Sequence, residues 1–352
     1  MIRGRSTLVI ALAAAVATAV VGVLLIPRPT ELSADVSGDE AIIATVRKQL
    51  TEIPGARERV SVAVIDGDRV RTANFGATDT TEYEIGSVTK TVTGSLLADA
   101  IARGEVEATT KLGDLLDLGD SPASTIRLEE LATQTSGLPA FPQTGTMMFS
   151  AILSQLRAGD PYPYTTDELV QAAKDVELGP KEFVYSNLGM SLLGHAVAAA
   201  AGTDWATLAA DRIFTPLRME STTAPTSLAD LRQDAPTGRT NSGRHAAPWT
   251  LSGNAPAGSI RSTLADMTKY ARAQLDGSAP GADAATPRVE LNESAEIGYA
   301  WITQGDVTWH NGGTGGFATW VGFDRDRDRA VVVLTSTASA VDPLGLALME
   351  VQ

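Results

Sequence analysis

The sequence predicts an α+β fold: one antiparallel sheet built from both chain ends, flanked by helices, with a mainly helical region inserted between the two groups of strands. Runs rich in β-branched residues occur near the start of the chain, at 60–76, and return near its end, at 297–336. Between them, from residue 87 to about 275, the apolar spacing is mostly helical. The simplest assembly joins both strand groups in one sheet covered by helices. A site is expected in the cleft between this sheet and the insertion.

The start of the chain predicts a membrane anchor. Arg3 and Arg5 precede an uncharged apolar run at 7–26, and a helix of about 20 residues spans a hydrocarbon core of roughly 30 Å. Positive charges favour the cytoplasmic side, so residues 1–27 are expected to form an uncleaved signal anchor. A signal peptide cleaved near the small residues at 17–19 is the alternative.

The rest of the chain divides into a spacer and one folded domain. Residues 28–39 contain proline, serine and acidic residues and are interpreted as a linker. Residues 40–352 are interpreted as the domain. The expected location is the cell membrane, with a single span and the domain outside the cytoplasm. If the signal is cleaved, the protein is secreted.

Local patterns predict the individual elements. A helix is expected at 41–50, and two strands at 60–67 and 68–76 form a hairpin around Asp66-Gly67-Asp68. Long polar loops are expected at 221–258 and 277–291. The later strands are expected at IGYAWIT (297–303), DVTWH (306–310), GFATWVGF (316–323) and RAVVVLTS (329–336), followed by a short helix within 341–352.

Composition excludes several classes of function. The net charge of −14 argues against nucleic-acid partners and against a basic surface that binds anionic lipid. The chain has no cysteine, so disulfides and thiolate nucleophiles are excluded. Its three histidines lie far apart and without metal-ligand spacing, so no metal site is expected.

The first candidate motif is EIGSVTKT at 84–91. Ser87 and Lys90 lie three apart and would share one face of a helix. A serine hydroxyl needs a base to become a nucleophile, and a lysine can be that base if burial or a neighbouring cation lowers its pKa. A capping serine beside a solvated lysine would produce the same pattern.

Two further stretches carry candidate residues. In Tyr185-Ser186-Asn187, between a loop and a helix, the tyrosine could carry a proton and the asparagine amide could hold a substrate carbonyl. Ser186 or Asn187 could equally cap the helix. In WHNGGTGGF, at 309–317, the glycines would let a ligand approach the backbone closely or let the strand bend.

Together these stretches resemble the serine penicillin-recognising enzymes, which include class C β-lactamases, D-alanyl-D-alanine carboxypeptidases and related esterases. That family shows Ser-x-x-Lys, later Tyr-x-Asn, and near the end Lys-Thr-Gly or His-x-Gly; here SVTK, YSN and HNG stand in that order. TQTSGLP at 133–139 resembles a further family turn, with Gln134 in place of histidine. The resemblance runs from about Ile43 to the C-terminus and implies a β-lactamase/transpeptidase-like fold.

The resemblance also implies a mechanism. Ser87 would attack the substrate carbonyl, and Lys90 and Tyr185 would take and relay its proton. The resemblance leaves open which of these two residues is the base. Backbone N–H groups of Ser87 and Gly313 would hold the oxyanion, and Asn187 would orient the acyl group. No metal or cofactor is needed. The substrate would be a small molecule or derived from peptidoglycan.

One departure from the family bears on the substrate. Many relatives carry lysine where this chain has His310, and Asn311 replaces the usual threonine ahead of Gly312. A histidine is mostly neutral at pH 7, so a fixed cation for a substrate carboxylate is missing. The resemblance associates His-x-Gly with carboxypeptidase- and esterase-like members, so such an activity is expected, with a class C-type β-lactamase as the alternative. A catalytically silent module that binds peptidoglycan or a protein is a further alternative.

Overall fold

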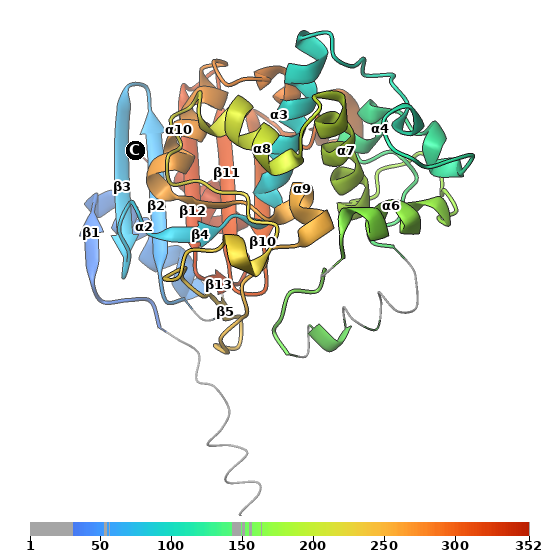
Figure 1. The fold of residues 1–352 in the computed structure, drawn as a ribbon. Helices are drawn as coiled ribbons and strands as arrows, with labels where there is room; N and C mark the ends of the chain where they lie inside the picture. The colour runs from blue at the N-terminus through green and yellow to red at the C-terminus, as the bar shows by residue number, and fades with distance from the viewer. Residues whose placement is uncertain are drawn as a thin grey trace, which may run out of the picture.

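The computed structural model describes residues 31–52, 55, 57–142, 149, 152–154, 157–162 and 164–351. Its centre is a nine-stranded sheet in the order β1-β3-β2-β12-β11-β10-β9-β8-β7 (Figure 1). All neighbouring strands run antiparallel. The two chain ends meet where β2 pairs with β12, from Val60 opposite Thr335 to Asp66 opposite Arg329. The predicted sheet from both chain ends is therefore confirmed.

The strands are short, and most lie in this one sheet. They are β1 (Val36–Gly38), β2 (Val60–Asp66), β3 (Arg69–Phe75), β7 (Val289–Asn292), β8 (Ala295–Ile297), β9 (Ile302–Gln304), β10 (Val307–Gly313), β11 (Ala318–Asp324) and β12 (Arg329–Thr335). Two small pairs lie outside it, β4 (Glu82–Glu84) with β6 (Arg261–Thr263), and β5 (Arg239–Thr240) with β13 (Thr337–Ala338).

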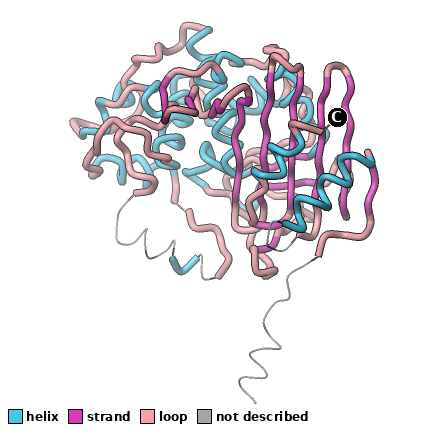
Figure 2. Tube along the Cα trace, turned by 180° about the vertical axis from the view of Figure 1, so that it is seen from behind, coloured by secondary structure: helices cyan, strands magenta, loops and turns pink. Residues whose placement is uncertain are grey.

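Helices cover both faces of the sheet. The α-helices of the described residues are α2 (Glu40–Glu52), α3 (Thr89–Ala102), α4 (Leu128–Ala132), α6 (Thr166–Lys174), α7 (Asn187–Ala200), α8 (Trp205–Ala209), α9 (Ala255–Gly258), α10 (Leu264–Leu275) and α11 (Asp342–Leu348). The terminal helices α2 and α11 contact each other and lie on one face, which Figure 2 shows from behind. Helix α10 covers the other face and adjoins the helical insertion, as expected.

Each central strand is apolar on both faces because both faces are covered. Val62 and Val64 of β2 face a cluster with Ile42 of α2, whereas Ala63 and Ile65 face the larger cluster that includes the inserted helices. Strand β12 alternates in the same way along Val331–Leu334. This sheet forms the rigid wall on which the site is built.

The structure also corrects some predicted elements. The expected strand at 297–303 is broken: β8 ends at Ile297, β9 begins at Ile302, and Ala300 between them has φ +68°. Trp301 faces the core there instead of continuing a ladder. Residues 36–38 of the predicted linker form the edge strand β1 against β3. The loops expected at 221–258 and 277–291 contain short pieces of helix and strand, including α9.

The predicted anchor at 1–27 lies outside the described residues. Among the helices within the described ranges, none combines the length and apolar character needed to cross a bilayer.

Candidate active site

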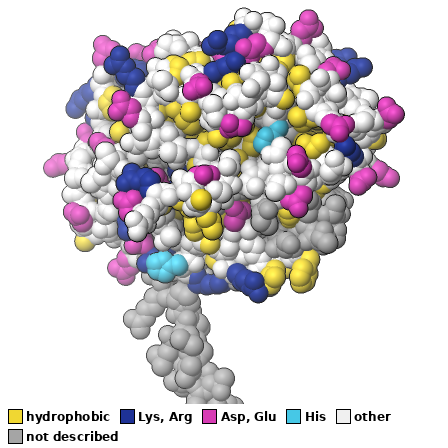
Figure 3. All heavy atoms as spheres, viewed as in Figure 1, with side chains coloured by type: hydrophobic (Ala, Val, Ile, Leu, Met, Phe, Trp, Pro, Cys, Tyr) yellow, Lys and Arg dark blue, Asp and Glu magenta, His cyan; other side chains and the backbone are white. Residues whose placement is uncertain are grey.

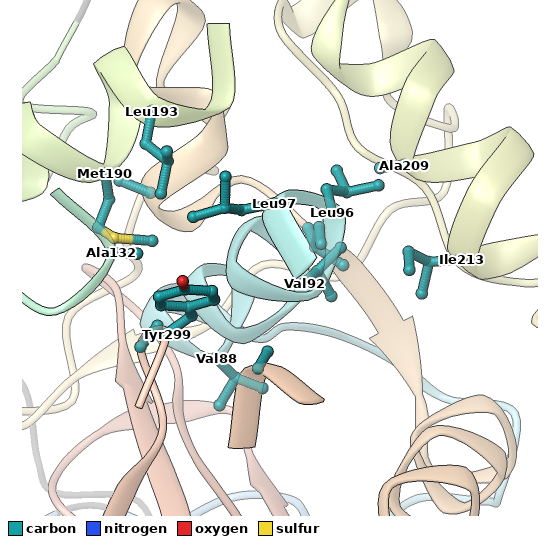
Figure 4. Packing of buried hydrophobic residues seen from close by; sticks show 14 of the residues in the cluster. Val88, Val92, Leu96, Leu97, Ala132, Met190, Leu193, Ala209, Ile213 and Tyr299 are labelled. Carbon is teal, nitrogen blue, oxygen red and sulfur yellow. The ribbon is translucent and has the colours of Figure 1, made fainter. Parts of the chain in front are cut away.

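The candidate nucleophile lies at the start of a deeply buried helix. Ser87 is half-buried in a single 3-10 turn, Gly86–Val88, which leads directly into α3. Gly86 has φ +51°, a backbone conformation that a glycine adopts without strain. Leu97 of α3 lies toward Met190 and Leu193 of α7, and Leu96 lies toward Ala209 (Figure 4). A helix fixed on nearly all sides holds the Ser87 hydroxyl at one position.

Lys90 is the partner of Ser87 and is fully buried. Its Nζ lies 2.9 Å from Ser87 Oγ and donates to the carbonyl oxygen of Ala257 at 2.7 Å. Burial lowers the pKa of Lys90 from 10.5 to about 7. A neutral amine can still donate to Ala257 while its lone pair accepts from Ser87, which is the arrangement of a base. The solvated lysine of the capping alternative is therefore not what the structure contains.

Tyr185 faces the same two residues from the loop before α7. Lys90 Nζ lies 4.8 Å from the centre of its ring, and its hydroxyl is hydrogen-bonded with Ser87. The residue is 37% exposed, so the ring borders solvent while the hydroxyl points inward. Partial burial raises the pKa of Tyr185 above its ordinary value of 10, although the hydrogen bond with Ser87 opposes this. The phenol is therefore protonated at neutral pH and can pass a proton on.

Helix α7 begins next to Tyr185, and Ser186 caps it. The Ser186 hydroxyl accepts from the N–H of Gly189 at 2.9 Å and donates to the carbonyl of Pro139 at 2.7 Å. Of the two capping candidates, Ser186 is therefore the residue that caps α7. The Asn187 side chain is left for the cavity beside Ser87 and is hydrogen-bonded with Tyr162.

Gln134 holds this loop in place. Its side-chain oxygen accepts from the N–H of Ser186 at 2.7 Å, and its backbone oxygen accepts from the N–H of Val184 at 2.9 Å. Gln134 is buried and has φ +62°. The sequence placed it in a family turn, and the structure links that turn to Tyr185 and Asn187.

His310 lies inside strand β10, facing inward. It is 2% exposed, its Nδ1 contacts the carbonyl oxygen of Asn311, and its ring centre lies 6.3 Å from that of Tyr185. Burial and the nearby Lys90 charge lower the pKa of His310 to about 4, against the raising effect of the Asn311 contact. His310 is therefore uncharged at pH 7. Asn311 next to it is exposed, and its amide donates to Asp342 at 2.6 Å.

The glycines after Asn311 bring two backbones together. A Cβ on Gly312 would lie 2.0 Å from the carbonyl oxygen of Ile85, and one on Gly86 would lie 2.6 Å from the backbone nitrogen of Gly313. The end of β10 thus packs directly on the turn that carries Ser87. This contact places the Gly313 backbone beside Ser87, where an oxyanion would form.

Two cavities open on either side of Ser87 and Gly313, which line both. A cavity of about 140 Å³ is also lined by Asn187, Tyr162 and Trp249. A cavity of about 360 Å³ is also lined by Tyr185, Asn311 and Asp342. A third cavity, of about 740 Å³, shares Tyr162 and Trp249 with the smallest one and is lined by further aromatic residues. A substrate carbonyl at Ser87 could therefore extend in both directions.

Sequence reasoning missed several residues of these walls. Tyr162 packs edge-on against Trp249, and the N–H of Trp249 donates to the buried carboxylate of Glu84 at 3.0 Å. Asp342 comes from α11, at the far end of the chain. Neither Tyr162, in the stretch PYPY, nor Trp249 belongs to a recognisable motif, and their position in space connects them with Ser87.

The described residues contain no group of three or more His, Asp or Glu side chains able to hold a metal ion. A serine bonded to a buried lysine of lowered pKa, beneath a close backbone contact, is instead suited to nucleophilic acyl transfer. The fold and this chemistry define a serine hydrolase. A model of the Beta-lactamase family matches residues 43–349, and the chain belongs to that family.

Known proteins agree with this assignment. Penicillin-binding protein 4 of Amycolatopsis lactamdurans is 28% identical over 294 residues, which cover 78% of this chain and 72% of that protein. A beta-lactamase of Escherichia coli K12 is 29% identical over 204 residues, and the putative beta-lactamase-like 1 of Homo sapiens is 26% identical over 258. These last two matches cover 56% and 66% of this chain, but 49% of each relative's own length.

A solved structure shares the fold. The crystal structure of a class C beta lactamase from Rhodobacter sphaeroides aligns with a TM-score of 0.72 at 20% identity, covering 88% of this chain and 97% of that one. The β-lactamase-like fold expected from the motifs is thereby confirmed.

Proposed function

We propose that the protein hydrolyses ester or peptide bonds through an acyl-enzyme on Ser87, in the manner of D-alanyl-D-alanine carboxypeptidases or related esterases. The observation that carries this proposal is the 2.9 Å contact between Ser87 Oγ and Lys90 Nζ, with Lys90 buried and its pKa near 7. About half of such lysines are neutral at pH 7 and able to accept a proton.

Acylation proceeds by exchange of the substrate's leaving group for Ser87. The Ser87 oxygen bonds to the carbonyl carbon while its proton moves to Lys90, and the oxyanion takes hydrogen bonds from the backbone N–H groups of Ser87 and Gly313. The bond to the leaving group then breaks, and Lys90 returns the proton to it through Tyr185. Water next attacks the acyl-enzyme, releases the acid and restores the Ser87 hydroxyl.

Lys90 is the better candidate for the base. The pKa of Tyr185 is raised above its ordinary value, so its phenolate is scarce at pH 7, whereas the pKa of Lys90 is lowered into the working range. Tyr185 is hydrogen-bonded with Ser87 and lies over Lys90, which suits a proton relay.

The substrate preference follows from His310. A β-lactam presents a carboxylate next to the reacting amide, and the neutral His310 gives that carboxylate no cation. We therefore expect measurable ester cleavage and weak lactam turnover. A class C-type β-lactamase is the alternative, supported by the similarity to the beta-lactamase of Escherichia coli and to the class C beta lactamase of Rhodobacter sphaeroides.

Active-site labelling tests the proposal. The domain from residue 31 onward is incubated with a fluorophosphonate and, separately, with a labelled penicillin, and the added mass is located by peptide mass spectrometry. We expect an adduct at Ser87 that is absent from Ser87→Ala. A folded sample that no reagent labels would favour the silent binding module. If labelling occurs, rates on D-Ala-D-Ala peptides, chromogenic lactams and short esters separate the substrates, and rapid lactam turnover would favour the β-lactamase.

We also propose that the apolar segment at 7–26 anchors the domain in the membrane, outside the cytoplasm. The full chain should pellet with membranes and be released by detergent but not by high salt. A variant beginning at residue 31 and carrying a replacement secretion signal serves as the control. Recovery of the full chain in the soluble extracytoplasmic fraction would instead support cleavage of a signal peptide.

A further inference from the structure

The cavity of about 360 Å³ beside Ser87 contains a single charged side chain among its lining residues, the carboxylate of Asp342. Asp342 is the first residue of α11 and is half-buried at the cavity wall. It accepts a hydrogen bond of 2.6 Å from the amide of Asn311 on β10. This bond fixes the carboxylate beside the strand end that carries Gly312 and Gly313.

The leaving group of the substrate should occupy this cavity. A departing alcohol or amine must receive a proton, and the proposed relay to it is Tyr185. Tyr185 lines the 360 Å³ cavity and does not line the 140 Å³ cavity, where Asn187 and Trp249 lie. The acyl group therefore fits the smaller cavity, and the leaving group lies on the side of Asp342.

Among the described residues that line this cavity, none is a lysine or arginine that could compensate a negative charge on the leaving group. His310 is buried and neutral at pH 7, and Lys90, which does not line the cavity, is bonded to Ser87 and Ala257. The hydroxyl of Thr319 donates to the carbonyl of Ile85. Arg57 donates to the backbone of Ala340 at 3.4 Å but does not line the cavity.

We propose that Asp342 selects the leaving group by charge. Cationic leaving groups, such as amino alcohols or amines bearing an ammonium group, are preferred, neutral ones are accepted, and leaving groups that carry a carboxylate are rejected. This inference rests on the proposed acyl-enzyme function and narrows its substrate class. Of the two activities proposed above, it therefore favours the esterase over the D-alanyl-D-alanine carboxypeptidase, because the departing D-alanine carries a free carboxylate, and it also disfavours β-lactams.

The test compares three thioesters of one acyl group on the full chain in detergent. Their leaving thiols are thiocholine, 3,3-dimethylbutanethiol and 3-mercaptopropionate, which carry a positive, no and a negative charge. Thiol release, followed with a chromogenic disulfide, gives kcat/KM for each. The quaternary ammonium cannot donate hydrogen bonds, but it makes the thiol of thiocholine more acidic. Each kcat/KM is therefore divided by the rate of hydroxide-catalysed hydrolysis of the same thioester, and the corrected ratios report recognition of the charge by the protein.

We expect the cationic thioester to exceed the anionic one by at least about tenfold at low salt, as a single charge acting over several ångströms in a partly solvated site would produce. The ratio should fall as salt is added. Asp342→Asn should lower the ratio by about tenfold. Glu350→Gln removes the same charge beyond the other end of α11, where Glu350 pairs with Arg327, and should leave the ratio unchanged.

Two results would overturn the inference. One is equal or reversed charge preference in the wild-type protein, and the other is a preference that persists in folded Asp342→Asn, as judged by circular dichroism and fluorophosphonate labelling. In both cases thioesters are still cleaved, so the acyl-enzyme function stands. If no thioester acylates Ser87, the acyl-enzyme proposal fails and the charge inference fails with it.

Discussion

Among the individual residues, Lys90 carries the strongest link between structure and chemistry. Its amine is buried, and within the described part of the chain its hydrogen-bond partners are the Ser87 hydroxyl and the Ala257 carbonyl. Burial is the cause that lowers its pKa, no described carboxylate forms an ion pair with it, and the neighbouring His310 is neutral. Burial without a counter-ion is what lowers the lysine pKa toward neutrality.

The first prediction concerns the pH dependence of acylation. Lys90 must be neutral to accept the proton of Ser87, so kcat/KM for an ester should rise with pH and level off above an inflection near the lysine pKa of about 7. Stopped-flow measurement of acylation between pH 5 and 9 determines the inflection. An acylation rate that stays constant from pH 5 to 9 would contradict the assignment of Lys90 as base.

The second prediction removes the base. Lys90→Met keeps an apolar side chain of similar length and should lower the acylation rate by about 10²–10⁴-fold, the typical contribution of a general base. Lys48→Met, which changes an exposed lysine on α2, is the control and should acylate at the wild-type rate. Acylation of folded Lys90→Met at a rate near wild type would assign the base to another group.

The third prediction uses a pair of adjacent glycines. Gly312→Ala places a methyl group against the Ile85 carbonyl and the Thr319 hydroxyl, and should destabilise the protein by about 1–3 kcal/mol while displacing the turn that carries Ser87. At Gly313 a Cβ meets nothing within 4 Å, so Gly313→Ala should unfold at nearly the wild-type urea concentration. Equal stability of the two variants would show that the contact between β10 and the Ser87 turn is loose.

At the scale of elements, the site is held by contacts between segments that are far apart in the chain. Arg261 on β6 is buried and pairs with Glu82 at 2.6 Å and Glu84 at 2.8 Å, both on β4. Strand β4 leads into the Ser87 turn, and Glu84 also holds the Trp249 backbone. The buried guanidinium of Arg261 therefore holds β4, which precedes the Ser87 turn, next to Trp249 in the wall of the cavity of about 140 Å³.

The fourth prediction breaks this link. Arg261→Met leaves two buried carboxylates without a counter-ion and should lower the free energy of unfolding by about 3–5 kcal/mol. Arg232→Met breaks an exposed pair with Asp234, in which both side chains are more than half exposed, and should leave the urea midpoint nearly unchanged. Similar urea midpoints for both variants would mean that β4 is held by other contacts.

At the scale of the whole molecule, the sheet closes the chain on itself, because β2 from the start pairs with β12 from the end. Helices α2 and α11 seal the same face of it. Figure 3 shows acidic side chains interspersed with basic ones over the face in view, in keeping with the net charge of −14. Folding therefore requires the complete domain, and the burial of Lys90 is part of its cost.

The fifth prediction measures that cost. Unfolded Lys90 has its ordinary pKa of 10.5, so between about pH 7 and 10.5 the unfolded state binds more protons than the folded one. The free energy of unfolding should then rise with pH by up to about 1.4 kcal/mol per unit. Urea titrations between pH 7.5 and 9.5 avoid the window of His310, which lies below its ordinary pKa of 6.5. Lys90→Met should flatten the slope, and an unchanged slope would locate the titrating group elsewhere.

The sequence predicted much of the fold because its signals there are local. The hairpin of β2 and β3 and the strands β10 to β12 follow from runs of β-branched and aromatic residues bounded by turn residues, and helix α2 follows from its apolar spacing. The prediction of a strand through 297–303 was wrong. Trp301 has the spacing of a strand residue, but the chain turns at Ala300, which has a positive φ, and the inserted helices bury Trp301. A pattern of apolar residues reports burial, and it does not report which element buries them.

The sequence by itself determined the family, the order of the motifs and the candidate residues Ser87, Lys90, Tyr185 and His310, because residue type and spacing along one chain suffice for these. Only the tertiary structure decided their environment. Burial lowers the pKa of Lys90, and Ser186 caps helix α7. Asp342, near the end of the chain, lines the same cavity as Ser87. Charge, exposure and distance depend on residues remote in sequence, and folding alone brings those residues together.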